Sequence, residues 1–387
     1  MSLLTEASLI VTPNAYKASK LYSVIPNTTL GDLNVVRNTT ATRVNEFGLI
    51  EVVGLNVPRL DYTSGSASIL VERQKTNLFL NSEPTANENS QQGVSYEAFN
   101  WGIRFSNCSR YLDNTALRLR YGGTAPASTE LTLSCFVIME NLNAPDVSGS
   151  TLTGDFSILI AGARTSNNTV KRFGTTNVYR VTGTRTTETT NLTANGILKY
   201  TTQSATGFRV VGWQLEVGSN ATSYIPTAGT SVTRNADLIS KTGISDLINS
   251  QQGVLFVEMA SLSNDLTNRD ITISGTSSNI ITLRFHTVSN NILTQVIINN
   301  SSVFVGQTAS QIQTNFNKIA VRWSLNNFSL WVNGVKYSES LSGGTFAVDS
   351  LFNLSISGVA NTFSGKIKDF QIYKEALTDT EIINLTT

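Results

Sequence analysis

Apolar and polar residues alternate over several strand-length segments, and this pattern limits the possible folds more than any other feature of the chain. Two segments show it clearly, with one face formed by Ile281, Leu283 and Phe285 and, in the second segment, by Ile319, Val321 and Trp323. A period of two residues is that of a half-buried β-strand, whereas an amphipathic helix repeats every 3.6 residues. The pattern therefore predicts β-sheets whose one face is buried.

The composition supports this interpretation. Thr, Val, Ile and aromatic residues favour strands, while the helix formers Lys, Glu and Ala are scarce. Asn, Ser and Gly supply turns. Charged residues make up only 14% of the chain, against about 25% in an average soluble protein. We expect an all-β protein with two jelly-roll or β-sandwich domains in series behind an extended N-terminal anchoring arm.

Prolines and turn residues divide the chain into three regions. Residues 1–75 hold three of the seven prolines and only short apolar bursts, so we expect an arm that serves attachment and oligomerisation. Residues 76–235 alternate short apolar segments with turns, which is typical of a jelly roll. Residues 236–387 hold the clearest strands and are expected to form a second sandwich. The stretch 218–235 has turn residues and no period, and we expect it to be a linker.

Two local signals in the third region predict details of its strands. Asn333 and Gly334 can supply the two positive φ values of a type I′ turn, so a hairpin is expected there. The apolar positions of residues 365–373 change parity once, which predicts a β-bulge between Ile367 and Phe370.

Two short helices are also expected. Ser245 is a candidate N-cap for a helix over residues 245–249. Thr378 and Glu381 have the spacing of a capping box, which predicts a short helix after the last strand.

The two cysteines and four tryptophans are assigned mostly to the interior. Cys108 and Cys135 can pair with each other, but we favour reduced, packed thiols, because one bridge in a chain of 387 residues is no disulfide framework. Trp331 lies out of phase with the apolar face of its strand and is expected to be exposed or to face a partner chain. Large aromatic residues usually fill sandwich interiors, so we expect core positions for Trp101, Trp213 and Trp323.

The reactive side chains give little support to an enzyme. His286 is the only histidine and falls on the polar face of its strand, so we expect it to be partly solvated and not catalytic. Without a second base, no Ser–His or Cys–His relay can be assembled. Zinc sites need several His and Cys ligands, and no phosphate-binding glycine loop occurs. We assign no catalytic, cofactor-binding or metal-binding residue, and we expect no enzymatic activity and no cofactor.

Two chemistries remain open, glycoside hydrolysis by paired carboxylates and calcium binding by oxygen ligands. Asp265 and Asp270 lie in a polar loop, residues 261–270, where we favour a solvated loop over a cation site.

A net charge of +1 gives no basic patch for nucleic acid. No segment reaches the roughly 18 apolar residues of a membrane span, and the start has no basic segment before its apolar run, so we expect neither membrane insertion nor a signal peptide.

Several segments resemble tailed-bacteriophage structural proteins of the fibre and adhesin kind. These are residues 37–51, 56–62, 69–78, 213–227 and 232–237. In that family such segments flank a jelly roll like that of carbohydrate-binding modules, so the resemblance implies one for the middle region. Phage fibres are usually homotrimers, which implies the same oligomer here.

The third region resembles concanavalin A-like, laminin-G-like lectin domains. The resemblance rests on residues 331–334, 365–373 and 376–381. It implies a lectin sandwich, but no calcium-binding or sugar-binding residue of that family transfers to a numbered position of this chain.

These resemblances imply a virion structural protein, a head or tail fibre that is made in the host cytoplasm and presents lectin-like domains to host-surface glycans on the virion exterior. Its arm would attach to a capsid, decoration or tail protein. The alternatives are a glycan depolymerase on the same scaffold and a decoration protein that binds no glycan.

We expect residues up to Tyr62 to be ordered only against other subunits, because their apolar residues show no regular period that could form a core. Removal of residues 1–60 should then leave both β domains folded.

Overall fold

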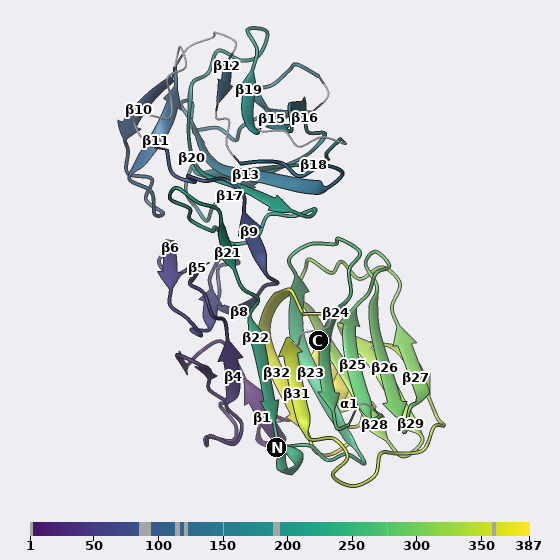
Figure 1. Ribbon diagram of the computed structural model, residues 1–387. Coiled ribbons are helices and arrows are strands. Elements are labelled where there is room, and N and C mark those ends of the chain that lie inside the picture. Colours follow the sequence, from purple (N-terminus) through teal and green to yellow (C-terminus); the bar gives the residue numbers. More distant parts are fainter. Residues whose placement is uncertain are drawn as a thin grey trace.

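The computed structural model describes residues 3–84, 94–112, 117–119, 123–149, 151–188, 194–276, 278–357 and 361–387. Strands form nearly all of its regular structure, so the all-β class is confirmed. Figure 1 shows a smaller unit above a larger one, with the N-terminal strands along one side of the larger unit. Within the described ranges, no helix is long and apolar enough to cross a membrane.

The larger unit is a sandwich of two antiparallel sheets. The first sheet has the order β30-β29-β28-β23-β32-β8-β7, and β1 also pairs with β32. Its strands are β1 (Ala7–Val11), β7 (Arg59–Asp61), β8 (Ser68–Val71), β23 (Gly253–Ser261), β28 (Asn317–Ser324), β29 (Asn327–Val332), β30 (Val335–Ser340) and β32 (Gly365–Tyr373).

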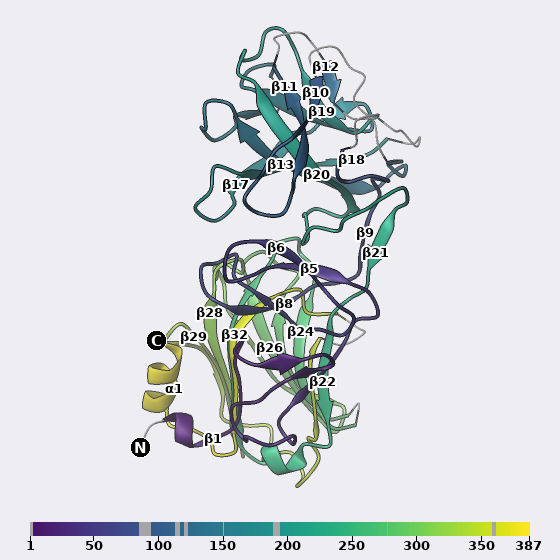
Figure 2. The ribbon, with the colours of Figure 1, turned by 90° about the vertical axis from the view of Figure 1, so that its left-hand side faces the viewer.

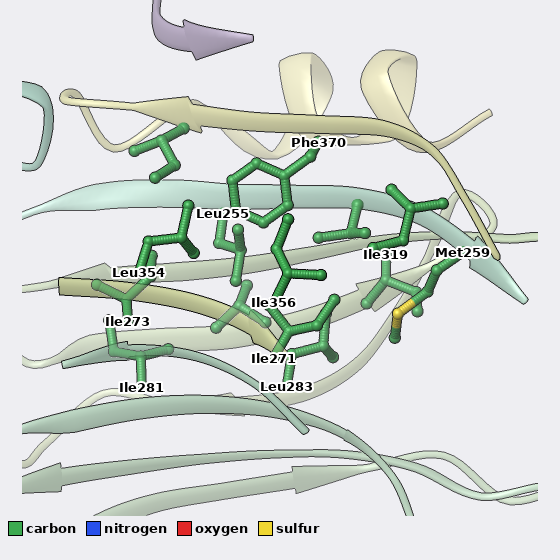
Figure 3. Packing of buried hydrophobic residues seen from close by; sticks show 14 of the residues in the cluster. Leu255, Met259, Ile271, Ile273, Ile281, Leu283, Ile319, Leu354, Ile356 and Phe370 are labelled. Atoms are coloured by element: carbon green, nitrogen blue, oxygen red, sulfur yellow. The ribbon is translucent and has the colours of Figure 1, made fainter. Parts of the chain in front are cut away.

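The second sheet has the order β2-β3-β4-β22-β31-β24-β25-β26-β27. Its strands are β2 (Tyr16–Lys17), β3 (Lys20–Leu21), β4 (Leu33–Val36), β22 (Leu238–Thr242), β24 (Arg269–Ser274), β25 (Ile280–Phe285), β26 (Ile292–Ile298), β27 (Ser301–Gln307) and β31 (Asn353–Ser357). The core lies between the sheets, where Leu255 and Phe370 of the first meet Ile271 and Leu283 of the second (Figure 3). Burial of each such side chain contributes about 1.5–3 kcal/mol.

The N-terminal region is part of this sandwich. β1 and β8 both pair with β32, and β4 pairs with β22. Leu9, Val35 and Ile69 are buried in the shared core. The expectation that residues up to Tyr62 find partners only in other subunits is therefore wrong. Each apolar burst is long enough to add one strand to a sheet that already exists, so the segment needs no core of its own.

The smaller unit is also built from two sheets. The six-stranded sheet contains β10 (Val94–Ala98), β11 (Asn107–Tyr111), β20 (Phe208–Val217), β13 (Glu130–Met139), β18 (Tyr179–Thr186) and β17 (Asn167–Arg172), in that order. The five-stranded sheet contains β12 (Leu117–Leu119), β19 (Gly196–Lys199), β15 (Phe156–Ile160), β14 (Val147–Ser148) and β16 (Ala163–Arg164). Leu133, Phe156 and Trp213 are fully buried in its core.

A two-stranded ribbon connects the units. It consists of β9 (Lys75–Asn77) and β21 (Val232–Arg234) (Figure 1). The expected linker, residues 218–235, does run between the units, but it is not an independent segment: Tyr224 and Ile225 are buried. A second pair, β5 (Ala41–Val44) and β6 (Ile50–Val53), lies at the end of the larger unit that faces the smaller one.

The predicted hairpin and bulge are both confirmed. Asn333 and Gly334 have φ values of 50° and 80° between β29 and β30. Across from β23, Glu258 pairs with Asp369 and Met259 with Ile367, so Lys368 is the additional residue of the bulge.

The C-terminal helix is confirmed, while the other helix differs from its prediction. α1 (Asp379–Thr386) begins with the expected capping box of Thr378 and Glu381. η1 (Leu3–Thr5) and η2 (Ser245–Leu247) are single 3-10 turns. Ser245 is not an N-cap, because it is already the first residue of η2. The N-cap position is occupied by Ile244, which makes no side-chain hydrogen bond to the turn.

The buried assignments hold with one exception. Trp101, Trp213 and Trp323 are buried, and both cysteines are free and buried, as expected. Trp331 is only 3% exposed, so its expected exposure is wrong. It lies on the outer face of the first sheet, where Leu377 and Ile382 pack with it in one cluster. Figure 2 shows α1 at this side of the larger unit.

Candidate functional site

A buried network of charged side chains holds the base of the ribbon. Arg59 lies at its centre, with Nη1 2.6 Å from Oε2 of Glu72 and Nη2 paired with Asp237. The other oxygen of Asp237 is 2.7 Å from Nη1 of Arg37, and Arg234 is 2.9 Å from Glu72. The network joins the N-terminal region to the segment that follows the jelly roll.

Burial works against every charge in this network, but the charges compensate one another. Burial opposes ionisation of Glu72, yet Arg234, Arg59 and hydrogen bonds from Ser223 overcome it, so the pKa of this carboxyl lies well below its usual value. Burial lowers the pKa of the Arg234 guanidinium. Buried ions that are paired and hydrogen-bonded in this way are costly to break.

Beside the network, a cleft with a volume of about 540 Å³ opens between the two units. This size falls within the roughly 300–1,000 Å³ of ligand sites. β13, β17 and β18 of the smaller unit form one wall, β5 contributes to the other, and the segment 219–224 lines the cleft between them. Figures 1 and 2 show β17 on the side of the smaller unit that faces β5 and β6.

Hydroxyl groups and aromatic rings line much of the cleft. The hydroxyls include those of Thr42, Thr63, Thr169, Thr182, Ser223 and Thr314. Phe136, Phe173 and Tyr224 supply the rings. Sugars present hydroxyl groups and apolar C–H faces, and this combination of hydroxyls and rings is suited to contact both.

The charge in the cleft is predominantly positive. The cationic lining residues are Arg43, Lys171, Arg172, Arg180 and Lys366, against the acidic residues Asp61 and Glu72. Both acids are already paired, since Lys366 Nζ lies 2.7 Å from Asp61 Oδ1 and Glu72 belongs to the buried network. The cleft therefore has an excess of positive charge.

The residues singled out in the sequence lie elsewhere. His286 is half-buried just after β25, and its Nδ1 accepts a hydrogen bond from the Val288 amide. Asp265 pairs with Arg269, and Asp270 forms two hydrogen bonds of 2.7 Å with Arg284. Arginines thus neutralise both carboxylates, and Asp270 lies in β24 and not in the expected loop. Across the described ranges, no three His, Cys, Asp or Glu side chains come together as a possible metal site.

Sequence reasoning missed the cleft and the network, although some signals were present. Arg59 and Glu72 stand in or next to short apolar strands, where an isolated charge would be unfavourable. A charged residue in such a place indicates a buried partner. The identity of that partner, however, depends on the tertiary structure.

The comparisons with known proteins bear on the larger unit. The sequence model of the Concanavalin A-like lectin/glucanases superfamily matches residues 255–383. This part of the chain, from β23 into α1, is similar to that superfamily and has a concanavalin A-like fold. The matched segment contributes Leu262, Ser263, Thr314 and Lys366 to the cleft, so it forms part of the wall opposite the jelly roll. No curated protein matches the chain.

Three solved structures illustrate the structural matches. A Ruminococcus gnavus IT-sialidase CBM40 bound to α2,3-sialyllactose is 15% identical, with a TM-score of 0.33, covering 37% of this chain and 87% of the other. Domain 4 of AbnA, a GH43 extracellular arabinanase from Geobacillus stearothermophilus, is 13% identical, with a TM-score of 0.34 and coverage of 44% and 82%. A SAP-like pentraxin from Limulus polyphemus is 15% identical, with a TM-score of 0.32 and coverage of 36% and 71%.

Proposed function

We propose that the protein is a glycan-binding structural protein of a tailed bacteriophage, a head or tail fibre whose lectin domain and jelly roll face the host surface. The observation that carries the glycan-binding proposal is the cleft between the two units. It has the volume of a ligand site, and hydroxyls, rings and cations line it. One of its walls comes partly from the concanavalin A-like lectin domain.

The phage setting is supported by the segments that resemble fibre proteins. Arg37, Arg59, Glu72, Arg234 and Asp237 all fall in these segments and together form the buried network. The resemblance therefore covers the residues that hold the jelly roll on the sandwich, which a family with this domain arrangement would need.

The proposal includes a homotrimer and attachment to another virion protein through the N-terminal region. Exposed apolar side chains support a contact surface there. Phe47 is 78% exposed, Leu55 is 56% exposed, and Leu49 and Val52 are also exposed. Apolar side chains that gather on a surface are typical of sites of protein association.

We further propose that the protein binds glycans without cleaving them. A glycosidase needs a carboxylic acid whose pKa is raised so that it can protonate the leaving group. The two acids of the cleft show the opposite shift, because Lys366 holds the pKa of buried Asp61 low and Arg234 and Arg59 do the same for Glu72.

A glycan array with the full chain tests the binding proposal, and mass spectrometry of purified virions tests the location. We expect affinities stronger than about millimolar for some members of the array, no new reducing ends after incubation with host capsule, and the protein among the virion components. A chain that binds no glycan and is absent from virions would overturn the proposal.

A further inference from the structure

Two positive charges face each other on the jelly-roll wall of the cleft. In the antiparallel pair of β17 and β18, Lys171 lies directly opposite Arg180, and both line the cleft. Like charges in directly opposite positions destabilise a sheet. Thr169 and Thr182 form the next opposite pair on the same face of the sheet, and their hydroxyls are hydrogen-bonded to each other.

Arg180 is fixed in place but is not neutralised. Its guanidinium lies 5.5 Å from the centre of the Phe136 ring, and one Nη donates a hydrogen bond of 2.9 Å to Ser134. Its Nε is buried and has no acceptor in the part of the chain that the structure describes. A buried donor without an acceptor is costly, so this group is suited to a ligand that supplies one.

The acids near Arg180 are occupied by other donors. Glu216 accepts hydrogen bonds from Gln214 and Thr222, and Glu72 pairs with Arg59 and Arg234. Neither forms a salt bridge with Arg180 among the described side chains. Lys171 is exposed and has no ion pair within that same set.

The opposite wall also holds a guanidinium with an open donor. Arg43 pairs with Glu51 through Nε, while its Nη1 is buried without an acceptor in the described structure. Two guanidinium groups, one from each wall, thus each keep an open donor. A guanidinium presents its donors in a planar fork that matches the oxygens of a carboxylate or sulfate.

We propose that the cleft binds an acidic saccharide whose anionic group lies against Arg180 and Lys171, within reach of Arg43. This inference rests on the proposed glycan-binding function and names the ligand class. The anion neutralises the opposed charges of Lys171 and Arg180. The hydroxyls of Thr169 and Thr182 lie next to it and can hydrogen-bond to the sugar ring. The anionic group can be a carboxylate or a sulfate ester, and the two are separated by experiment.

The test compares matched acidic and neutral saccharides on the full chain by isothermal titration calorimetry. The pairs are trigalacturonate with its methyl ester, 3′-sialyllactose with lactose, and 6-sulfolactose with lactose. We expect at least one acidic member to bind roughly tenfold or more tightly than its neutral partner, as for a hydrogen bond to a charged group. The binding should weaken at high salt, and the pair that shows the effect separates carboxylate from sulfate.

Three variants assign the binding to the cleft. Lys171→Gln and Arg180→Gln should each weaken acidic binding by roughly ten- to a hundredfold and weaken neutral binding much less. Lys374→Gln is the control, since it removes the same charge from an exposed residue outside the cleft and should change neither. Lys171 is exposed, so its variant decides the matter even if Arg180→Gln fails to fold.

The outcomes separate this inference from the function on which it rests. If neutral and acidic members bind equally, or if Lys171→Gln weakens binding no more than Lys374→Gln, the anionic site is wrong and glycan binding stands. If no saccharide on the glycan array binds at all, the proposed function fails and this inference fails with it.

Discussion

Arg37 and Asp237 lie 200 positions apart in the sequence and form a buried ion pair, with 2.7 Å between Nη1 and Oδ1. The second oxygen of the same carboxylate pairs with Arg59. Asp237 therefore holds two parts of the N-terminal region at the point where the chain re-enters the sandwich after the jelly roll.

Asp237→Asn should strongly destabilise the protein. It removes the shared charge, so the buried Arg37 loses its ion-pair partner and Arg59 keeps only Glu72, which costs about 3–5 kcal/mol. Urea denaturation of the variant measures this loss. Asp246→Asn is the matched control, since Asp246 is exposed and its replacement should change the free energy of unfolding by less than about 0.5 kcal/mol. Equal effects of the two substitutions would contradict a structural role for the network.

Stability should fall on acidification because of Glu72. Its folded-state pKa lies below the ordinary value of 4.5, so the unfolded chain binds protons first as the pH decreases. The stabilisation is fully present above pH 4.5 and is lost as the pH falls towards the folded-state pKa. Asp61 acts in the same direction, whereas burial raises the pKa of Asp369 and gives the opposite sign.

The pH effect is measured as the free energy of unfolding between pH 7 and pH 3. Glu72→Gln should lower the stability at pH 7 and flatten its decrease in acid. Glu188→Gln, at a carboxylate that is 73% exposed, should leave the slope unchanged. An unchanged slope in Glu72→Gln would show that other groups govern acid unfolding.

The burial of Trp331 depends on α1, and two neighbouring isoleucines test it. Ile382 is fully buried, while Ile383 is 41% exposed. Ile382→Ala should cost about 2–5 kcal/mol and shift Trp331 fluorescence to longer wavelength, whereas Ile383→Ala should cost much less. Similar losses in both variants would mean that the helix is not docked through this face.

The N-terminal strands should be required for the stability of the sandwich. Leu9 is fully buried in β1, and Leu4 is 53% exposed just before it. Leu9→Ala should cost about 2–5 kcal/mol, and Leu4→Ala should have little effect. Removal of residues 1–60 should lower the melting temperature of the sandwich sharply, and an unchanged melting temperature would restore the interpretation as a separate arm.

Both thiols should be inert in the folded protein. Burial raises the pKa of Cys108 to about 12 and raises that of Cys135 as well, so almost no thiolate exists at neutral pH. Ellman's reagent should detect no thiol in native protein and two in urea. Rapid native labelling would contradict the burial of these residues.

Local features of the fold were predictable from the sequence, because short-range chemistry determines them. The turn at Asn333 and Gly334 needs positive φ values, and the parity change between Ile367 and Phe370 leaves no other register for a strand with one buried face. The capping box depends on residues three positions apart. None of these features depends on which distant segment is the partner.

The pairing of distant segments was not predictable in this way. Ala7 lies opposite Tyr373, and no property of either strand specifies the other. Likewise, no property of the strand that holds Trp331 specifies that Leu377 and Ile382 cover its side chain. No site residue was assigned from the sequence, because Lys171 and Arg180 become neighbours only through the register of β17 and β18, and because two units must meet to form the cleft.

The position of β32 between β1, β8 and β23 constrains the order of events during synthesis. β1 and β8 leave the ribosome long before β32, their common partner, has been translated. The jelly roll is continuous in sequence and can close during this interval. Until β32 is made, the edges of β1 and β8 that later pair with it stay unpaired. Unpaired strand edges are prone to intermolecular pairing. A chain released from the ribosome before residue 365 therefore lacks β32, the strand with which β1 and β8 pair.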